Sequence, residues 1–226
     1  MSKPILIITF VCSIFFFSKN CNSQSKTYFG LCGGISYFKF KEIKNLDVYI
    51  ADYQGKLNYN FGFSFLIKVN KNITFNTALK FANKSMGVKW KQWTFDSLLN
   101  IHVIDRSKII EQFSFEIPVK FSFYPNKNSK LFFDIAASLS NQIKNTLDND
   151  HILGLNDEFE NQLGFDKVNL FIEAGLGYKI NCDNSLILIE PYAGIYIPKL
   201  YDKATFENNG NPVIIGINLQ YLFSMN

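Results

Sequence analysis

Between Leu57 and Val69 the chain alternates strictly between apolar residues and residues that are mostly small or polar. A period of two predicts a β-strand, because successive side chains point to opposite sides of the pleat. The apolar face of this segment is long and rich in aromatic residues, whereas the opposite face is small and polar apart from Leu66. Such a strand is typical of a barrel wall with lipid outside and a filled polar lumen inside.

The same alternation returns in eight segments, and it is blurred only in the seventh, where Leu186 and Leu188 interrupt the polar face. We expect strands at 28–37, 57–69, 73–81, 113–123, 131–140, 168–180, 186–197 and 213–223. These lengths suit tilted strands that cross a bilayer, which takes about 9–11 residues. The predicted fold is all-β, an eight-stranded antiparallel up-and-down transmembrane β-barrel.

The connections between these segments alternate in length. Three are short, at 70–72, 125–130 and 181–185, and four are long, at 38–56, 83–112, 141–167 and 198–212. Outer-membrane barrels have short periplasmic turns and longer extracellular loops. Aromatic residues gather at the short-turn ends and predict one half of an interfacial girdle. They are Tyr28, Phe29, Phe121, Phe123, Tyr124, Tyr178, Tyr221 and Phe223.

The N-terminus is predicted to be a secretory signal peptide over residues 1–23, leaving the barrel domain at 24–226. Lys3 supplies a positive charge, and the apolar run 5–17 has the length of a signal-peptide core. An uncleaved membrane anchor is disfavoured, because 13 residues are too few to span a bilayer. Lys19 and Asn20 precede Cys21, so the sequence lacks the small residue that a lipoprotein signal places there.

Composition removes several other classes of protein. Although 47% of residues are hydrophobic, the chain has no apolar run of 18 residues, so a transmembrane helix is not expected. The formal charge of +4 falls to +2 without Lys3 and Lys19, which is too little for a nucleic-acid binder. Only Cys32 and Cys182 follow the signal peptide, so no disulfide framework is expected, and a single bridge between them has no other support.

The predicted lumen contains four positive and four negative side chains. They are Lys68, Lys80, Lys120, Lys179, Glu116, Asp134, Glu173 and Glu190. Isolated charges are costly in a closed space, so we expect a salt-bridge network that crosses and plugs the lumen. Glu116 and Lys120 lie about 13 Å apart along one strand, and each is expected to pair with a neighbouring strand. Paired carboxylates also serve glycosidases, but nothing marks a substrate cleft.

No other residues form a convincing site, and we expect no catalytic residues, no metal site and no cofactor. His102 and His151 are far apart in predicted loops without the spacing of metal ligands. The acidic stretch 148–160 lacks the spacing and glycine of a Ca²⁺ loop. Gly175 and Gly177 are interpreted as small inward-facing residues, and no serine or cysteine has a nearby histidine for a triad.

Three of the predicted strands carry a family resemblance. The segment 113–124 (FSFEIPVKFSFY), with 170–178 (LFIEAGLGY) and 190–196 (EPYAGIY), resembles the PorT-like outer-membrane β-barrel family of Bacteroidetes. The resemblance implies an eight-stranded barrel in the outer membrane, and a few such relatives are linked to secretion systems. Pro118 within this pattern is tolerated only where its missing donor is not needed, for example at a bulge.

The leading hypothesis is a non-enzymatic barrel in contact with outer-membrane lipid, whose extracellular loops contact an unidentified extracellular or secretion-machinery protein or serve a structural role. Trp90, Trp93 and Phe95 in the predicted second long loop either bind such a partner or extend the barrel above the membrane. Three alternatives stay open at this point: a soluble lipocalin-like carrier with its apolar face inward, a lipid-modifying barrel enzyme, and a narrow channel. The oligomeric state is also open.

Overall fold

The computed structural model describes residues 26–39, 51–95, 101–146, 168–197 and 213–225, so the predicted signal peptide lies outside the described part. The described residues form nine strands. They are β1 (Thr27–Lys39), β2 (Ala51–Gly55), β3 (Leu57–Lys68), β4 (Ile73–Phe95), β5 (Ile101–Phe123), β6 (Leu131–Thr146), β7 (Val168–Asn181), β8 (Ser185–Ile197) and β9 (Val213–Met225). No helix in these ranges has the length and apolar character that crossing a membrane requires.

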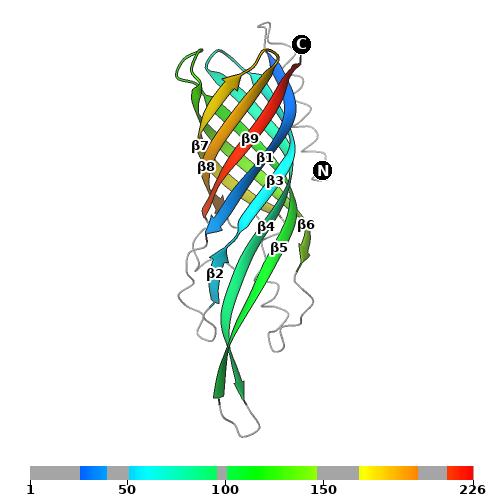
Figure 1. The fold of residues 1–226 in the computed structure, drawn as a ribbon, viewed down its shortest axis with the longest axis vertical. Helices are drawn as coiled ribbons and strands as arrows, with labels where there is room; N and C mark the ends of the chain where they lie inside the picture. The colour runs from blue at the N-terminus through cyan, green and yellow to red at the C-terminus, as the bar shows by residue number, and fades with distance from the viewer. Residues whose placement is uncertain (1–25, 40–50, 96–100, 147–167, 198–212, 226) are drawn as a thin grey trace, which may run out of the picture.

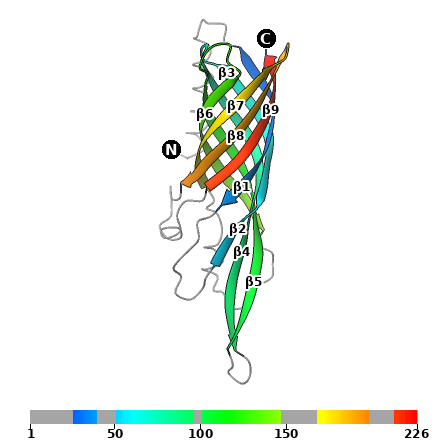
Figure 2. The same ribbon diagram turned by 60° about the vertical axis from the view of Figure 1, so that its left-hand side comes forward.

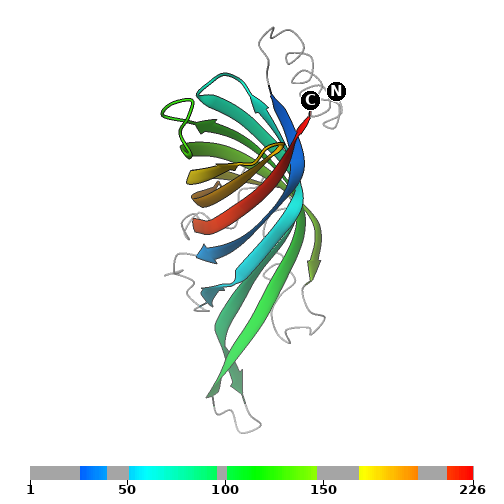
Figure 3. The ribbon, with the colours of Figure 1, turned by 45° about the horizontal axis from the view of Figure 1, so that its top comes forward.

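The strands close into an antiparallel barrel (Figures 1 and 3). The order β4-β3-β1-β9-β8-β7-β6-β5 is completed by pairing of β4 with β5. Following paired residues once around the wall from Thr27 ends at Tyr37 on the same strand, a stagger of ten residues. The path runs through Ile67, Phe75, Phe121, Ile135, Ala174, Ala193 and Ile215. Eight tilted strands leave an interior that side chains can fill, and the predicted fold class is confirmed.

The ninth strand, β2, continues β3 across an irregularity in the pairing with β4. Gly55 faces Met86, whereas Tyr59 faces Asn83, so β2 and β3 carry one residue more than β4 over this stretch. Asn58 lies in the irregularity and is buried, and its Oδ1 accepts hydrogen bonds from the backbone N (2.5 Å) and Oγ (3.2 Å) of Ser85. The Asn58 side chain therefore replaces the ladder bond that the bulge removes.

Replacing Asn58 by alanine is expected to lower the free energy of unfolding by about 1–3 kcal/mol, because the Ser85 N–H loses its acceptor. Urea titration of the barrel in lipid vesicles measures the change. Asn70→Ala in the exposed β3–β4 turn removes an amide that also accepts two backbone hydrogen bonds, but from donors that water can reach. An Asn58 loss no larger than the Asn70 loss contradicts the assigned role of Asn58.

The wall has an apolar outer face and a polar inner face. In β3, for example, Phe61 and Phe63 are 58% and 55% exposed, whereas Asn60 before them and Ser64 after them are buried. The same alternation runs through β7, β8 and β9. A soluble carrier has the opposite arrangement, with its apolar side chains inside, so this geometry rules out the lipocalin-like alternative.

Two residues of the predicted girdle face the other way. Tyr28 and Tyr124 point into the barrel and are buried, while Phe29 and Phe123 beside them are exposed on the outer face. Adjacent residues of a strand point to opposite faces, so both members of such a pair cannot belong to one girdle. The remaining residues of the predicted girdle face outward, namely Phe29, Phe121, Phe123, Tyr178, Tyr221 and Phe223.

The predicted loops at 38–56, 83–112 and 141–167 are partly wrong. β4 continues to Phe95 and β5 begins at Ile101, so that most of 83–112 is a hairpin that projects past the rest of the barrel (Figures 1 and 2). β2 lies within 38–56, and β6 extends to Thr146. Once a strand leaves the bilayer, both of its faces meet water. The apolar alternation then ends although the backbone pairing continues.

Pro118 interrupts the ladder without producing the bulge that was offered as an example. Pairing of β4 with β5 skips from Thr77–Val119 to Lys80–Glu116 in unchanged register. Thr77 Oγ1 donates to the carbonyl oxygen of Pro118 at 3.0 Å across this gap. Since proline cannot donate to the ladder, a local gap bridged by a hydroxyl satisfies the strand.

Candidate functional site

The lumen is the candidate site, because every wall strand sends alternate side chains into it. At the end of the barrel that carries the short turns 69–72, 124–130 and 182–184, called the short-turn end below, most of these side chains are apolar. They form a buried cluster of Tyr28, Leu66, Tyr124, Phe132, Leu186, Leu188 and Leu222. Leu186 and Leu188, which blur the alternation of the sequence, thus belong to a plug that closes this end.

A layer of buried charges lies next to the plug. Lys120 Nζ on β5 lies 2.6 Å from Glu190 Oε2 on β8 and 4.0 Å from Asp134 Oδ2 on the adjacent β6. Gln220 Nε2 donates to Glu190 Oε2 at 2.9 Å, and its Oε1 accepts from Ser64 Oγ at 2.7 Å. β5 and β8 are separated by two strands in the wall, so the lysine spans the lumen and ties opposite walls together.

A second charged layer lies nearer the end of the barrel from which the β4–β5 hairpin projects. Lys84 Nζ lies 2.5 Å from Glu116 Oε1 and donates to Ser140 Oγ at 3.0 Å. The same ammonium lies 4.2 Å from the ring centroid of Phe171, in range of a cation–π interaction. Lys80 Nζ donates to Asn218 Oδ1 at 3.1 Å, which joins β4 to β9.

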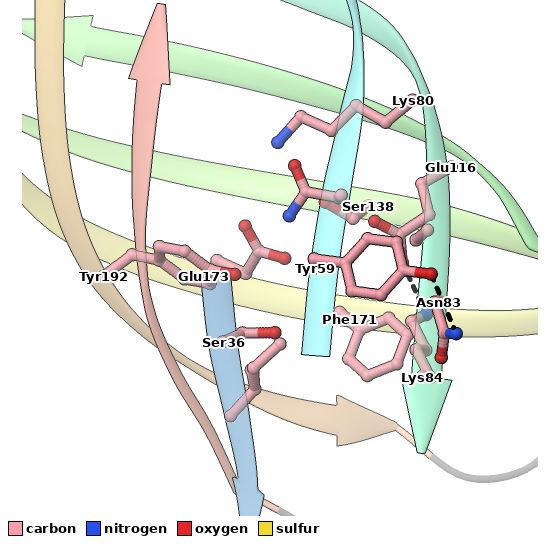
Figure 4. Close-up of a pocket in the computed structure, with 13 residues that line it drawn as sticks. Ser36, Tyr59, Lys80, Asn83, Lys84, Glu116, Ser138, Phe171, Glu173 and Tyr192 are labelled. Atoms are coloured by element: carbon pink, nitrogen blue, oxygen red, sulfur yellow. Dashed lines mark hydrogen bonds and ion pairs between the residues drawn. The ribbon is translucent and has the colours of Figure 1, made fainter. Parts of the chain in front are cut away.

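A small cavity lies beside this second layer (Figure 4). Its lining includes Lys80, Lys84, Glu116, Glu173 and Tyr192. Its volume of about 20 Å³ accommodates one or two water molecules and no organic substrate. Between the cavity and the short-turn end lie the charged layer of Lys120 and the apolar plug, so the described side chains leave no open path along the lumen.

The structure confirms the predicted cross-lumen network and corrects part of its pairing. Glu116 pairs with Lys84 on the adjacent β4, as expected of a neighbouring strand. Lys120 is different, since its shorter contact is with Glu190 across the lumen. Lys84 was absent from the predicted inward set because it fell in a predicted loop. Lys80 and Lys84 are four residues apart, and residues at this spacing in a strand lie on the same face. This spacing is the sequence signal that places Lys84 in the lumen.

Lys68 and Lys179 do not belong to the charged layers. Both lie at the short-turn end, where Lys68 Nζ is 5.8 Å from the ring centroid of Tyr28 and Lys179 Nζ is 4.4 Å from that of Tyr124. The tyrosine rings that cap the plug thus provide cation–π contacts for these two ammonium groups.

The other candidate residues of the sequence stay apart. His102 lies in the projecting part of β5, and His151 and the acidic stretch 148–160 lie outside the described residues. Cys32 is buried and Cys182 exposed, and both are free thiols. Among the residues that the structure describes, no three His, Cys, Asp or Glu side chains gather as metal ligands.

Gly175 and Gly177 are confirmed as small inward-facing residues. A Cβ at Gly177 would lie 2.0 Å from the Phe132 ring of the plug.

Replacing Gly177 by valine is therefore expected to lower the free energy of unfolding by about 1–3 kcal/mol through overpacking. Ala174→Val on the lipid-facing side of the same strand is the matched control, with an expected change within about 0.5 kcal/mol. Equal unfolding midpoints for the two variants in urea would mean that Phe132 does not fill this position.

The family described as outer membrane protein β-barrel domain matches residues 22–198. The attachment invasion locus protein of Yersinia pestis, solved with the heparin analogue sucrose octasulfate, is 14% identical, with a TM-score of 0.44 over 88% of this chain and 99% of that chain. OprG of Pseudomonas aeruginosa is 11% identical, with a TM-score of 0.43 over 89% and 96% of the two chains. No curated protein matches this chain.

Proposed function

Because this chain belongs to the outer membrane protein β-barrel domain family, and is thus a protein of the outer membrane, we propose that it is a non-conducting, non-enzymatic barrel whose β4–β5 hairpin contacts a protein partner. In this proposal the side chains in the lumen stabilise the barrel, and the hairpin binds the partner. Short turns of such barrels face the periplasm, so the hairpin projects from the cell surface.

The length of the hairpin carries the proposal. β3 pairs with β4 only as far as Asn83, whereas β4 and β5 remain paired to Phe95 and Ile101. The 12 residues after Asn83, up to Phe95, correspond to roughly 40 Å of strand. β2 accompanies β4 over 86–90, and the last five residues of β4, 91–95, pair with β5 alone. A barrel that needs only to cross the membrane has no use for this extension, which ends in a two-stranded ribbon where a partner reaches it.

The ribbon also has free edges. Within the described residues, β4 beyond Trp90 pairs only with β5, and β5 before Glu111 pairs only with β4. Unpaired strand edges accept an extended segment of another protein through main-chain hydrogen bonds. Val103 and Ile109 are about half exposed on this ribbon and offer apolar contacts to such a segment.

The family resemblance supports one class of partner for the hairpin, a component of a secretion machine. The segment 113–124 that resembles PorT-like barrels covers the membrane part of β5, up to its end at Phe123, and lies directly below the ribbon. Since some PorT-like proteins are linked to secretion systems, a surface-exposed component of a secretion machine is the partner we favour over an unrelated extracellular ligand.

A narrow channel and a lipid-modifying enzyme are the competing functions. Against a channel stand the apolar plug and the direct Lys120–Glu190 contact across the lumen. Against an enzyme stands the pairing of Glu116 and Glu190 with lysines: Glu116 lines a cavity that holds only water-sized molecules, and Glu190 is fully buried. Planar-bilayer recordings separate the channel from the proposal, because a plugged barrel gives no discrete conductance steps.

Site-specific photo-crosslinking in living cells tests the role of the hairpin. A photoreactive amino acid at Val103 or Ser107, both exposed on the ribbon, is expected to yield a discrete adduct with a second protein. The same amino acid at Leu219, exposed on the lipid-facing wall, is the matched control and should not yield this adduct. If neither ribbon position gives an adduct while the barrel is correctly assembled, the hairpin is not a partner-binding surface.

A further inference from the structure

The short-turn end of the barrel is strongly basic. Its described residues include six lysines and a single acidic residue, Asp183. The lysines are Lys26, Lys68, Lys71, Lys127, Lys130 and Lys179. The projecting part of the β4–β5 hairpin is different, since it mixes both signs, with Asp105 and Glu111 among its basic residues. Among the described residues, the hairpin sets Lys89, Lys91, Arg106 and Lys108 against these two acids, so the excess of positive charge is larger at the short-turn end.

Two backbone hydrogen bonds fix neighbouring lysines beside each other. The N–H of Lys68 donates to the carbonyl oxygen of Lys26 at 3.2 Å, and the N–H of Lys179 donates to that of Lys130 at 2.7 Å. Lys68 and Lys179 point into the mouth of the barrel over tyrosine rings. Like charges held this close repel each other, and an anionic counterpart outside the protein removes that cost.

Four of the lysines form an outer collar, defined here as Lys26, Lys71, Lys127 and Lys130, all of which are exposed. Lys26 precedes β1, Lys71 lies in the β3–β4 turn, and Lys127 and Lys130 lie in the β5–β6 turn. In the wall these elements follow one another from β1 through β6. The collar thus surrounds much of the rim and is not gathered in one patch, which suits many small partners better than one protein.

The collar also lies at the depth of lipid headgroups. Each of its lysines is one to four residues from the last exposed apolar side chain of its strand, such as Phe29, Phe123 or Leu131. At about 3.3 Å per residue this is at most about 13 Å beyond the apolar belt. The headgroup layer begins directly outside the hydrocarbon, within reach of a lysine side chain.

We propose that the collar binds the headgroups of anionic phospholipids in the periplasmic leaflet and thereby fixes the depth of the barrel in the membrane. The phosphate and the net negative charge of such lipids complement the four ammonium groups. Each lysine near an anionic lipid surface increases the binding constant for that surface by about fivefold. The proposal does not depend on the role of the hairpin, because the two features lie at opposite ends of the barrel.

Native mass spectrometry of the full chain in detergent tests this proposal. The protein is incubated with equal amounts of phosphatidylglycerol and phosphatidylcholine of the same acyl chains, and the retained lipids are counted. We expect about tenfold enrichment of phosphatidylglycerol. The variant Lys26→Gln/Lys71→Gln/Lys127→Gln/Lys130→Gln should reduce the enrichment to about twofold or less. The control Lys89→Gln/Lys91→Gln/Arg106→Gln/Lys108→Gln removes the same charge from the hairpin and should leave the enrichment intact.

All three proteins must show the same heat-dependent shift on gels, which establishes that they are folded. Equal retention of the two lipids by the wild type overturns the proposal, as does undiminished enrichment in the collar variant. If the wild type has no lipid preference but sediments with isolated peptidoglycan, the collar is a contact with the cell wall, and the lipid assignment is wrong.

Discussion

Replacing Lys120 by methionine is expected to lower the free energy of unfolding by about 3–5 kcal/mol. The Lys120 ammonium lies between Glu190 and Asp134, and all three side chains are buried. Methionine keeps most of the volume but removes the charge that compensates Glu190, which has no solvent-exposed surface. One donor, Gln220 Nε2, still reaches Glu190 Oε2, but a neutral amide does not replace an ammonium ion.

Urea titration in lipid vesicles, read from the gel mobility of the folded barrel, measures this loss. Lys89→Met, at an exposed position of the β4–β5 hairpin, is the matched control, with an expected change within about 0.5 kcal/mol. Adding Glu190→Gln to Lys120→Met removes the uncompensated carboxylate and should recover more than half of the lost stability. A Lys120 variant as stable as the Lys89 variant would mean that the cross-lumen pair does not hold the barrel together.

Replacing Leu219 by arginine should lower the free energy of unfolding by about 2–4 kcal/mol, the cost of a charge near the midplane of a bilayer. Leu219 lies at the centre of β9, and its side chain is 54% exposed on the outer face. The control position is Val103, whose side chain is 48% exposed on the projecting hairpin and contacts water instead of lipid. Val103→Arg is expected to change stability by no more than about 0.5 kcal/mol. Equal effects of the two substitutions would contradict lipid contact at Leu219.

The wall of the barrel was predictable from the sequence because lipid imposes the same rule on every strand. Each outward side chain must be apolar and each inward one must fit a narrow lumen, so that alternation alone assigns residues such as Phe61 and Asn60 to their faces. The short turns were equally clear, since the alternation stops and resumes within a few residues. Asn70 even supplies the turn chemistry, with its Oδ1 accepting from the N–H groups of Asn72 and Ile73.

The hairpin was not predictable in this way, because no lipid contacts it. Between Ser85 and Phe95 the two faces of β4 carry mixed residues, although the backbone pairing with β5 continues without a shift in register. Because the predicted strand ended before this stretch, Lys84 was not among the residues predicted to face the lumen. Which acid pairs with Lys120 was not predictable either. Across a lumen the partner depends on the stagger of the whole barrel, which links β5 to β8, and no local spacing in the sequence encodes it.

The central claim is that this chain is a closed barrel whose apolar outer face meets outer-membrane lipid and whose lumen is filled. The most direct test is a gel of the outer-membrane fraction run in SDS with and without boiling. We expect a membrane-bound protein whose unboiled band migrates apart from the boiled band, because a closed ladder of strands resists SDS until it is heated. A protein that is found in the soluble fraction, with one mobility under both conditions, would contradict it.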